Sequence, residues 1–251
     1  IIVYGFFFVL FSCSTENTKE DNLITYPDTK TVPFIETLHG TEISDPYRWL
    51  EDFTSDEANA WVAKQNAFTQ TFIKETAIKT AIREDLSKIW VSDSISTPFK
   101  KEGKTFYYFN NGMWQQSKLM MKACDTCDEE VLLDPNKFSD DGTVSLGSIS
   151  ISPNAEYMAY SISDGGSDWK SWKILTIADK SLLEDNLLWT KFSGAVWEND
   201  NSGFYYLKYD EPAGEALLEV NEAPQLLFHT LNTAQSKDKL IYKNSEKPRW
   251  S

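Results

Sequence analysis

Three similar strand segments recur along this chain at intervals of about fifty residues. They begin at Gly103, Ala155 and Ser202. Each segment is preceded by a polar turn and consists largely of aromatic and apolar residues. A repeat of this length is typical of a four-stranded propeller blade. The repeat therefore predicts three blades, at residues 97–135, 143–190 and 194–244.

The blade pattern is most complete around the second and third segments. Each is preceded by a short apolar strand, at 149–151 and 195–197, and followed by a partner strand, at 172–175 and 225–228. Because a propeller needs at least four blades to close its ring, we expect the ring to continue in a longer protein.

Residues 54–90 have helical rather than strand periodicity. Thr54 and Glu57 have the spacing of a capping box, which predicts the start of the first helix. The expected apolar face of the first helix carries Trp61, Val62, Phe68, Phe72 and Ile73. The expected apolar face of the second helix carries Ile78, Ile82, Leu86 and Ile89. Both helices should be amphipathic and should pack against a larger body.

The charge balance argues against two classes of partner. The chain has 24 Lys and Arg against 38 Asp and Glu, a formal net charge of -14. Nucleic-acid binding requires a basic surface to contact phosphates, and anionic lipid requires a basic patch. We therefore expect neither a nucleic-acid site nor electrostatic membrane binding.

The first thirteen residues are apolar and end in Cys13. This run is too short to span a bilayer and resembles a signal-peptide core without its basic leader. Residues 10–13 resemble the lipobox of bacterial lipoproteins, in which the cysteine is lipidated after cleavage, although Phe11 is bulkier than the residue usual there. Residues 1–22 are thus predicted to be a signal and tether, with lipid attachment at Cys13 and export to the periplasm or cell envelope. The alternative is an ordinary signal peptide with an incidental cysteine.

The other two cysteines, Cys124 and Cys127, are separated by two residues. A zinc site of this type needs a second pair of ligands, and the chain offers only the distant His39 and His229. We expect a loop tip between two strands, with either a local disulfide or unpaired thiols, and no metal or cofactor.

Several motifs resemble the prolyl oligopeptidase family, and they occur in the family's order. The N-terminal signature comprises residues 45–52 (DPYRWLED) and 61–66 (WVAKQN). Further matching stretches lie at 133–136, 139–144, 166–169, 191–193 and 247–250. The resemblance extends from about Tyr26 to the last residue.

This resemblance implies a two-domain serine peptidase. A C-terminal α/β-hydrolase domain carries the Ser-Asp-His triad, and a seven-bladed propeller caps it and excludes large substrates. The predicted fold is mainly β: about three blades of that propeller at 93–251, preceded at 23–92 by a helical segment that packs on the hydrolase domain, which this sequence does not include. Short proline-containing peptides are the expected partners of the whole enzyme, and we expect a monomer.

No catalytic residue is assigned to this chain. The closest match to a GxSxG nucleophile elbow is 142–147, which has the wrong spacing. His39 falls in a turn that the family uses structurally, and His229 lies on a predicted strand, where a hydrogen-bonded core or surface histidine is the more common situation. The chain alone should therefore have no peptidase activity.

Two positions match residues that reach the substrate in the family. Phe192, in Lys-Phe-Ser, matches a ring that lines the pocket for the residue two before the cleavage-site proline; the alternative is a strand residue in an inter-blade core. Asp168, in Gly-Ser-Asp-Trp, matches an aspartate that holds a substrate-binding arginine; the alternative is an Asx turn after Gly165 and Gly166.

Two other functions share this architecture. One is a propeller lipoprotein that binds peptides or protein partners without a hydrolase domain. The other is a related peptidase that cleaves after basic residues. The motifs at 45–52 and 166–169 favour the proline-specific branch.

Overall fold

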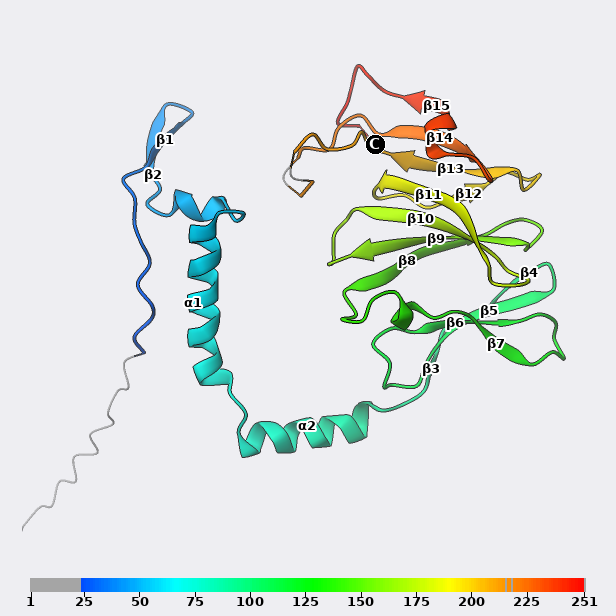
Figure 1. Ribbon diagram of the computed structural model, residues 1–251, viewed down its shortest axis with the longest axis horizontal. Helices are drawn as coiled ribbons and strands as arrows, with labels where there is room; N and C mark the ends of the chain where they lie inside the picture. Colours follow the sequence, from blue (N-terminus) through cyan, green and yellow to red (C-terminus); the bar gives the residue numbers. More distant parts are fainter. Residues whose placement is uncertain (1–23, 215, 218, 251) are drawn as a thin grey trace, which may run out of the picture. The chain divides into compact units, whose positions relative to one another are not determined.

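The computed structural model describes residues 24–214, 216–217 and 219–250. The chain forms two compact units, one ending at Ile82 and one beginning at Arg83 (Figure 1). The predicted signal and tether at 1–22, including Cys13, lie outside the described residues. Within the described part, no helix is both long and apolar enough to cross a membrane.

The first unit contains a β-hairpin and a long helix. The hairpin pairs β1 (Ile35–Leu38) with β2 (Thr41–Ser44), and its turn places His39 and Gly40 at positive φ. A short 3-10 helix, η1 (Arg48–Glu51), leads into α1 (Asp56–Ile73). The next helix, α2 (Ala77–Trp90), carries the chain past Ile82.

The signature at 45–52 has a structural role within this unit. Arg48 forms ion pairs with Glu36 on the hairpin and with Asp45, the latter at 2.9 Å between Nε and Oδ2. The indole Nε1 of Trp49 donates a hydrogen bond to the Lys30 carbonyl at 2.9 Å. These contacts join η1 to the hairpin and to the segment that precedes it.

The helix start differs by one residue from the prediction. Ser55, not Thr54, caps α1: its hydroxyl accepts a hydrogen bond from the Ala58 amide at 3.2 Å. Thr54 instead donates to Asp52 Oδ1 at 2.9 Å, and Glu57 pairs with Lys30. The predicted Thr54–Glu57 capping box is therefore wrong.

The predicted apolar residues of both helices are largely exposed. The exposed members are Val62, Phe72, Ile73, Ile78, Ile82, Leu86 and Ile89. Packing of these helices against a larger body stays a prediction.

The second unit is a stack of three antiparallel sheets (Figure 1). Blade 1 comprises β3 (Ser94–Ile95), β4 (Phe99–Lys101), β5 (Lys104–Asn110), β6 (Lys118–Lys122) and β7 (Glu129–Leu133). Blade 2 comprises β8 (Val144–Ile151), β9 (Tyr157–Asp164), β10 (Lys170–Thr176) and β11 (Leu182–Thr190). Blade 3 comprises β12 (Val196–Trp197), β13 (Gly203–Lys208), β14 (Gln225–Thr230) and β15 (Lys239–Lys243).

Each sheet follows the up-and-down order of a propeller blade. In blade 1, β3 and β4 pair with successive parts of β5 and so share one strand position. Two short 3-10 helices, η2 (Pro135–Lys137) and η3 (Gln235–Lys237), lie in the connections. The sheets confirm the predicted mainly-β fold with part of a propeller.

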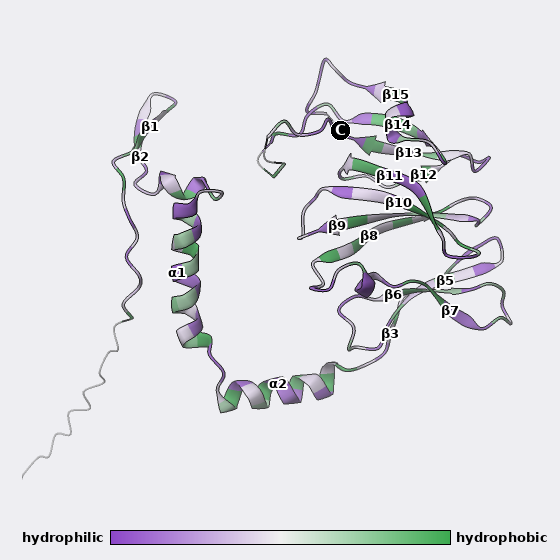
Figure 2. Ribbon diagram, in the orientation of Figure 1, coloured by the Kyte–Doolittle hydropathy of each residue, from purple (hydrophilic) through white to green (hydrophobic). Residues whose placement is uncertain are grey.

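The core lies between neighbouring blades, and the strands of all three sheets carry hydrophobic residues (Figure 2). Met158 and Ala159 are adjacent on β9, yet they belong to different clusters, because successive side chains on a strand point to opposite faces. One cluster joins blade 2 to blade 1, around Phe106 and Leu119, and the other joins it to blade 3, around Trp172 and Phe204. The middle sheet is thus buried on both faces.

Cys124 and Cys127 form a disulfide in the connection between β6 and β7. This confirms the predicted loop tip between two strands. The sequence left open whether the thiols form a disulfide or stay unpaired, and the structure shows the disulfide. Among the described residues, no group of three or more His, Cys, Asp or Glu is arranged to hold a metal ion.

Gly203 provides a test of the packing between strands. A Cβ at Gly203 would lie 1.8 Å from the His229 carbonyl oxygen on β14, whereas a Cβ at Gly194 would meet nothing within 4 Å. We expect Gly203→Ala to lower the free energy of unfolding by about 2 kcal/mol or more, and Gly194→Ala to change it by less than about 0.5 kcal/mol. Urea unfolding followed by tryptophan fluorescence would measure both; equal effects would contradict the close strand contact.

Candidate functional site

The two predicted substrate-contacting residues lie at the same end of the blades. Asp168 follows β9 and Phe192 follows β11. These strands run in the same direction because β10 lies between them and is antiparallel to both. The loop after β13 starts at this end as well, because Tyr209 follows β13 and its amide donates a hydrogen bond to the Trp189 carbonyl at the end of β11. We call residues 165–169, 189–193 and 209–213 the rim.

Asp168 has an exposed side chain on the rim. The turn that carries it is closed by other groups: the Ser167 amide donates to the Asp164 carbonyl at 3.0 Å, and the Ser167 hydroxyl accepts from the Trp169 amide at 3.1 Å. The structure therefore does not support an Asx turn built on Asp168. Its role in substrate binding stays a prediction.

Phe192 is 70% exposed, so it does not lie in an inter-blade core. Its backbone has a φ of 51°, in the left-handed region that few non-glycine residues adopt. Flanking contacts hold this conformation: the Tyr209 amide donates to the Trp189 carbonyl at 2.9 Å, and the Ser193 hydroxyl accepts from the Leu207 amide at 3.3 Å. The ring is thus presented at the rim by a turn with flanking hydrogen bonds, and its role in lining a substrate pocket stays a prediction.

Trp169 connects the three parts of the rim. Its ring lies edge-on to Trp189, with centroids 5.4 Å apart, and to Tyr209 at 6.2 Å. Its Nε1 donates a hydrogen bond to the Ala216 carbonyl at 2.9 Å, and the Lys191 ammonium lies 4.0 Å from its ring centroid. Sequence reasoning assigned no role to Trp169 or Lys191, although both stand in the matched motifs at 166–169 and 191–193.

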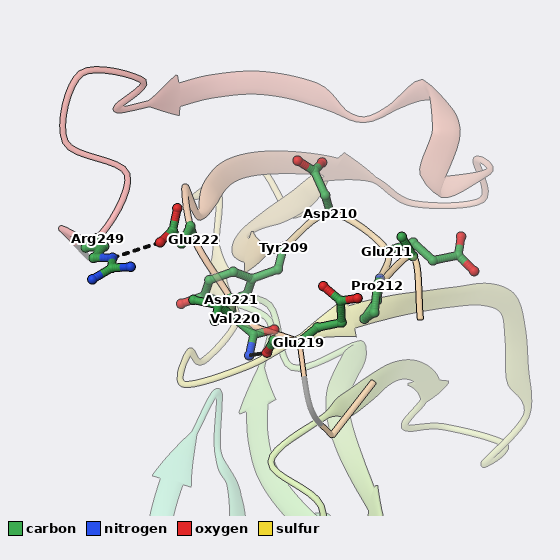
Figure 3. A pocket seen from close by; sticks show the side chains of 10 residues that line it. Tyr209, Asp210, Glu211, Pro212, Glu219, Val220, Asn221, Glu222 and Arg249 are labelled. Carbon is green, nitrogen blue, oxygen red and sulfur yellow. Dashed lines mark hydrogen bonds and ion pairs between the residues drawn. The ribbon is translucent and has the colours of Figure 1, made fainter. Parts of the chain in front are cut away.

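A pocket of about 410 Å³ adjoins the rim at Tyr209 (Figure 3). Its lining includes the carboxylates of Asp210, Glu211, Glu219 and Glu222. Arg249 pairs with Glu222 at 2.8 Å between Nε and Oε1. Asp210 pairs with Lys243 at 3.4 Å, so Glu211 and Glu219 leave the pocket with an acidic lining.

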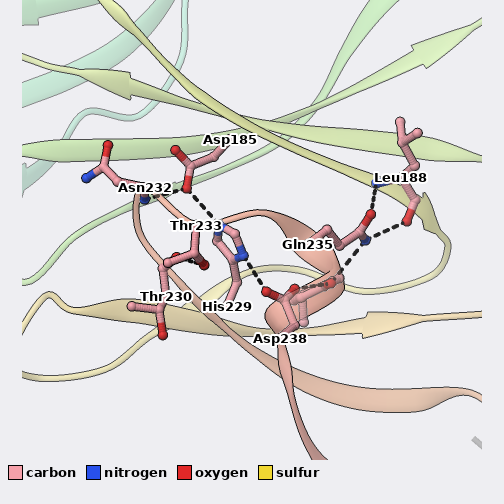
Figure 4. Close-up of polar contacts among 9 residues, drawn as sticks. Asp185, Leu188, His229, Thr230, Asn232, Thr233, Gln235 and Asp238 are labelled. Atoms are coloured by element: carbon pink, nitrogen blue, oxygen red, sulfur yellow. Dashed lines mark hydrogen bonds and ion pairs between the residues drawn. The ribbon is translucent and has the colours of Figure 1, made fainter.

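His229 lies away from the rim, between blades 2 and 3 (Figure 4). It is completely buried, and both ring nitrogens contact carboxylates: Nε2 lies 2.7 Å from Asp185 Oδ1 on β11, and Nδ1 lies 2.7 Å from Asp238 Oδ1. With both nitrogens occupied, the ring cannot act as a general base. His229 is the hydrogen-bonded core histidine that its strand position predicted.

The charge of His229 follows from these contacts. Burial disfavours the imidazolium, but hydrogen bonds and charge attraction from Asp238 and Asp185 outweigh it and raise the pKa of His229 above 6.5. Tyr206 donates to the second oxygen of Asp238 at 2.5 Å. The imidazolium is therefore a charged link across the seam between two blades.

The other histidine, His39, is exposed in the turn between β1 and β2. In the described residues neither histidine has a serine hydroxyl among its hydrogen-bond partners. The described part of the chain thus assembles no Ser-His pair.

The geometry defines a class: part of a β-propeller whose loops at one end present an aromatic and an acidic residue. The sequence profile described as "Prolyl oligopeptidase, N-terminal beta-propeller domain" matches residues 27–251. The chain therefore belongs to the prolyl oligopeptidase family, and it carries part of the family's N-terminal propeller domain.

Individual relatives agree with this assignment. The chain is 41% identical over 240 residues to a prolyl endopeptidase of Elizabethkingia meningoseptica, an alignment that covers 95% of this chain and 34% of the relative. It is 28% identical to prolyl oligopeptidase A of Amanita bisporigera, over 86% of this chain and 32% of the relative. The chain thus spans about a third of the length of these curated relatives.

Solved structures show the same fold. One is a prolyl endopeptidase from a structural and mechanistic analysis of two such enzymes. It superimposes with a TM-score of 0.81 at 29% identity, over 88% of this chain and 33% of the solved chain. Prolyl oligopeptidase B from Galerina marginata, bound to a 35mer substrate, gives a TM-score of 0.80 at 24% identity, over 91% of this chain and 35% of that one.

The link at His229 should make stability depend on pH. Because folding raises the pKa of His229 above 6.5, its contribution is fully present below that pH and is lost as pH rises through the folded-state pKa. His229→Gln should cost about 3 kcal/mol at pH 6, since it leaves a buried carboxylate without its charged partner. The difference from wild type should shrink as pH rises. Urea unfolding at pH 6 to 9 would measure it; a difference that does not change with pH would contradict a charged His229.

Proposed function

We propose that this chain is the N-terminal part of a serine endopeptidase that cleaves short peptides on the C-terminal side of proline. The observation that carries the proposal is the 41% identity to a prolyl endopeptidase over 95% of this chain. The propeller fold and its similarity to a prolyl endopeptidase structure support it.

In this proposal the triad lies in the part of the enzyme that corresponds to the remaining length of the relatives. There a serine would attack the carbonyl after proline and form an acyl-enzyme, with histidine as base and then acid, and aspartate orienting the histidine. The propeller would restrict entry to short peptides. The Phe192 ring would form an apolar wall for the residue two before proline, and Asp168 would hold a substrate-binding arginine of the hydrolase domain.

The exposed apolar faces of α1 and α2 fit the same arrangement. Side chains such as Ile78 and Ile89 are more than 70% exposed in this chain, and burying each against a hydrolase domain would contribute about 1.5–3 kcal/mol. We propose that both helices pack on that domain.

We also propose export and lipid attachment at Cys13. The apolar run before Cys13 and the lipobox-like residues 10–13 support this location, and a disulfide at Cys124–Cys127 is favoured in an oxidising compartment.

Cys13→Ser should release the protein from the membrane fraction into the soluble fraction of the cell envelope, because lipidation requires the thiol. Cell fractionation and immunoblotting would show it, with Cys124→Ser as the control that keeps the anchor. Membrane association that persists in Cys13→Ser would contradict lipid attachment at this residue.

The alternative is a propeller lipoprotein that binds peptides without cleaving them. The rim and the acidic pocket are also compatible with this function. The complete reading frame decides between the two: a GxSxG motif followed by Asp and His supports the peptidase, and their absence supports the binding protein.

Phe192 provides the kinetic test of the proposed peptidase. In the protein expressed from the complete reading frame, Phe192→Ala should lower kcat/KM about tenfold or more for peptides with an apolar residue two before proline, because apolar burial is lost. Leu182→Ala, which changes an exposed apolar residue at the opposite end of β11, is the control. Proline-linked p-nitroanilides would provide the measurement, and residues 1–251 alone should give no turnover. Turnover by this segment would contradict the absence of a triad.

A further inference from the structure

Lys191 is a lysine with an unusual environment on the rim. It is only 8% exposed, and its ammonium lies against two aromatic rings, 4.0 Å from the Trp169 centroid and 5.8 Å from that of Phe192. Within residues 24–214, 216–217 and 219–250, no carboxylate lies within ion-pair distance of its Nζ and no acceptor within hydrogen-bond distance, although the Nζ atom itself is open to solvent. An ammonium has three N–H donors. Aromatic faces attract its positive charge but do not provide conventional hydrogen-bond acceptors for these donors.

Lys118 shows how the same contact is completed elsewhere in the fold. It lies at the corresponding end of blade 1, with its ammonium 3.9 Å from the Trp114 ring centroid. Lys118 also forms an ion pair with Asp134, at 3.2 Å between Nζ and Oδ2. The two lysines thus share a tryptophan platform, but Lys118 has an anionic partner and Lys191 has none among the described residues.

The position of Lys191 indicates what could accept its hydrogen bonds. Its ammonium is next to the exposed Phe192 ring, so a peptide residue packed on that ring would bring its own main-chain carbonyl close to Nζ. An acidic ligand fits less well, since the adjoining pocket already carries several carboxylates and like charges repel. A neutral carbonyl accepts the hydrogen bond without that repulsion.

We propose that Lys191, held on Trp169, donates a hydrogen bond to the main-chain carbonyl of the peptide residue that packs on Phe192. This inference rests on the proposed peptidase function and adds a substrate-binding residue to it. Lys191 would fix the position of the peptide backbone, while Phe192 contacts the side chain.

The test combines Lys191 variants with a substrate that lacks the carbonyl. In the protein from the complete reading frame, Lys191→Met should raise KM about tenfold for a blocked Phe-Gly-Pro p-nitroanilide, with kcat little changed, because a hydrogen bond from a charged donor is lost. For the analogue in which an alkene replaces the Phe-Gly amide, wild type and Lys191→Met should have the same KM. Lys191→Arg should retain most of the affinity for the amide substrate.

Lys118→Met is the matched control, because it removes a lysine with the same tryptophan contact and should leave KM unchanged for both substrates. An equal effect of Lys191→Met on both substrates would overturn the proposal and indicate a partner elsewhere in the protein. Absence of any cleavage by wild type would instead defeat the proposed function. In that case, calorimetry would measure the binding of the amide peptide and of its alkene analogue to wild type and to Lys191→Met. A loss of affinity in Lys191→Met that is confined to the amide peptide supports the hydrogen bond. An equal loss of affinity for both peptides, or no loss, excludes it.

Discussion

The structure depends on the packing of each four-stranded sheet against the next. A single blade has too few residues to bury its own apolar side chains, so each buries them against its neighbour. Blade 2 shows the result, since Met158 and Ala159 on β9 face different neighbours. At the seam with blade 3, Trp172 and Phe204 are fully buried and a charged His229 bridges two carboxylates. Because the sheets of this stack are packed against one another, the loops at their ends place Asp168 and Phe192 on the same rim.

The contacts across that seam repeat with the length of a blade. Asn154 and Asn201 are 47 residues apart and hydrogen-bonded, and the same separation joins Ser150 to Trp197 and Trp169 to Ala216. Such recurrence is expected when one structural unit is stacked on a copy of itself. The seam and the rim are therefore produced by the same repeat.

The sequence predicted the blades because strand periodicity and turn residues are local signals. It singled out Asp168 and Phe192 through motifs rather than through physical reasoning, and their role in substrate binding stays a prediction. It did not predict the cap at Ser55, because Ser and Thr are neighbours there and the backbone decides between them. Nor could it predict the contacts of Trp169 or the link from Asp185 to His229, since both join distant segments that only tertiary packing brings together.

The hydrogen bond from Trp169 to Ala216 has an evolutionary consequence. It holds the connection after β13 through a backbone carbonyl, not through a side chain. Any amino acid at that position supplies the same acceptor. Side chains of this segment, including those that line the acidic pocket, can therefore mutate without releasing it from Trp169. The charge and size of the pocket lining can therefore diverge between relatives while the anchoring geometry is inherited unchanged.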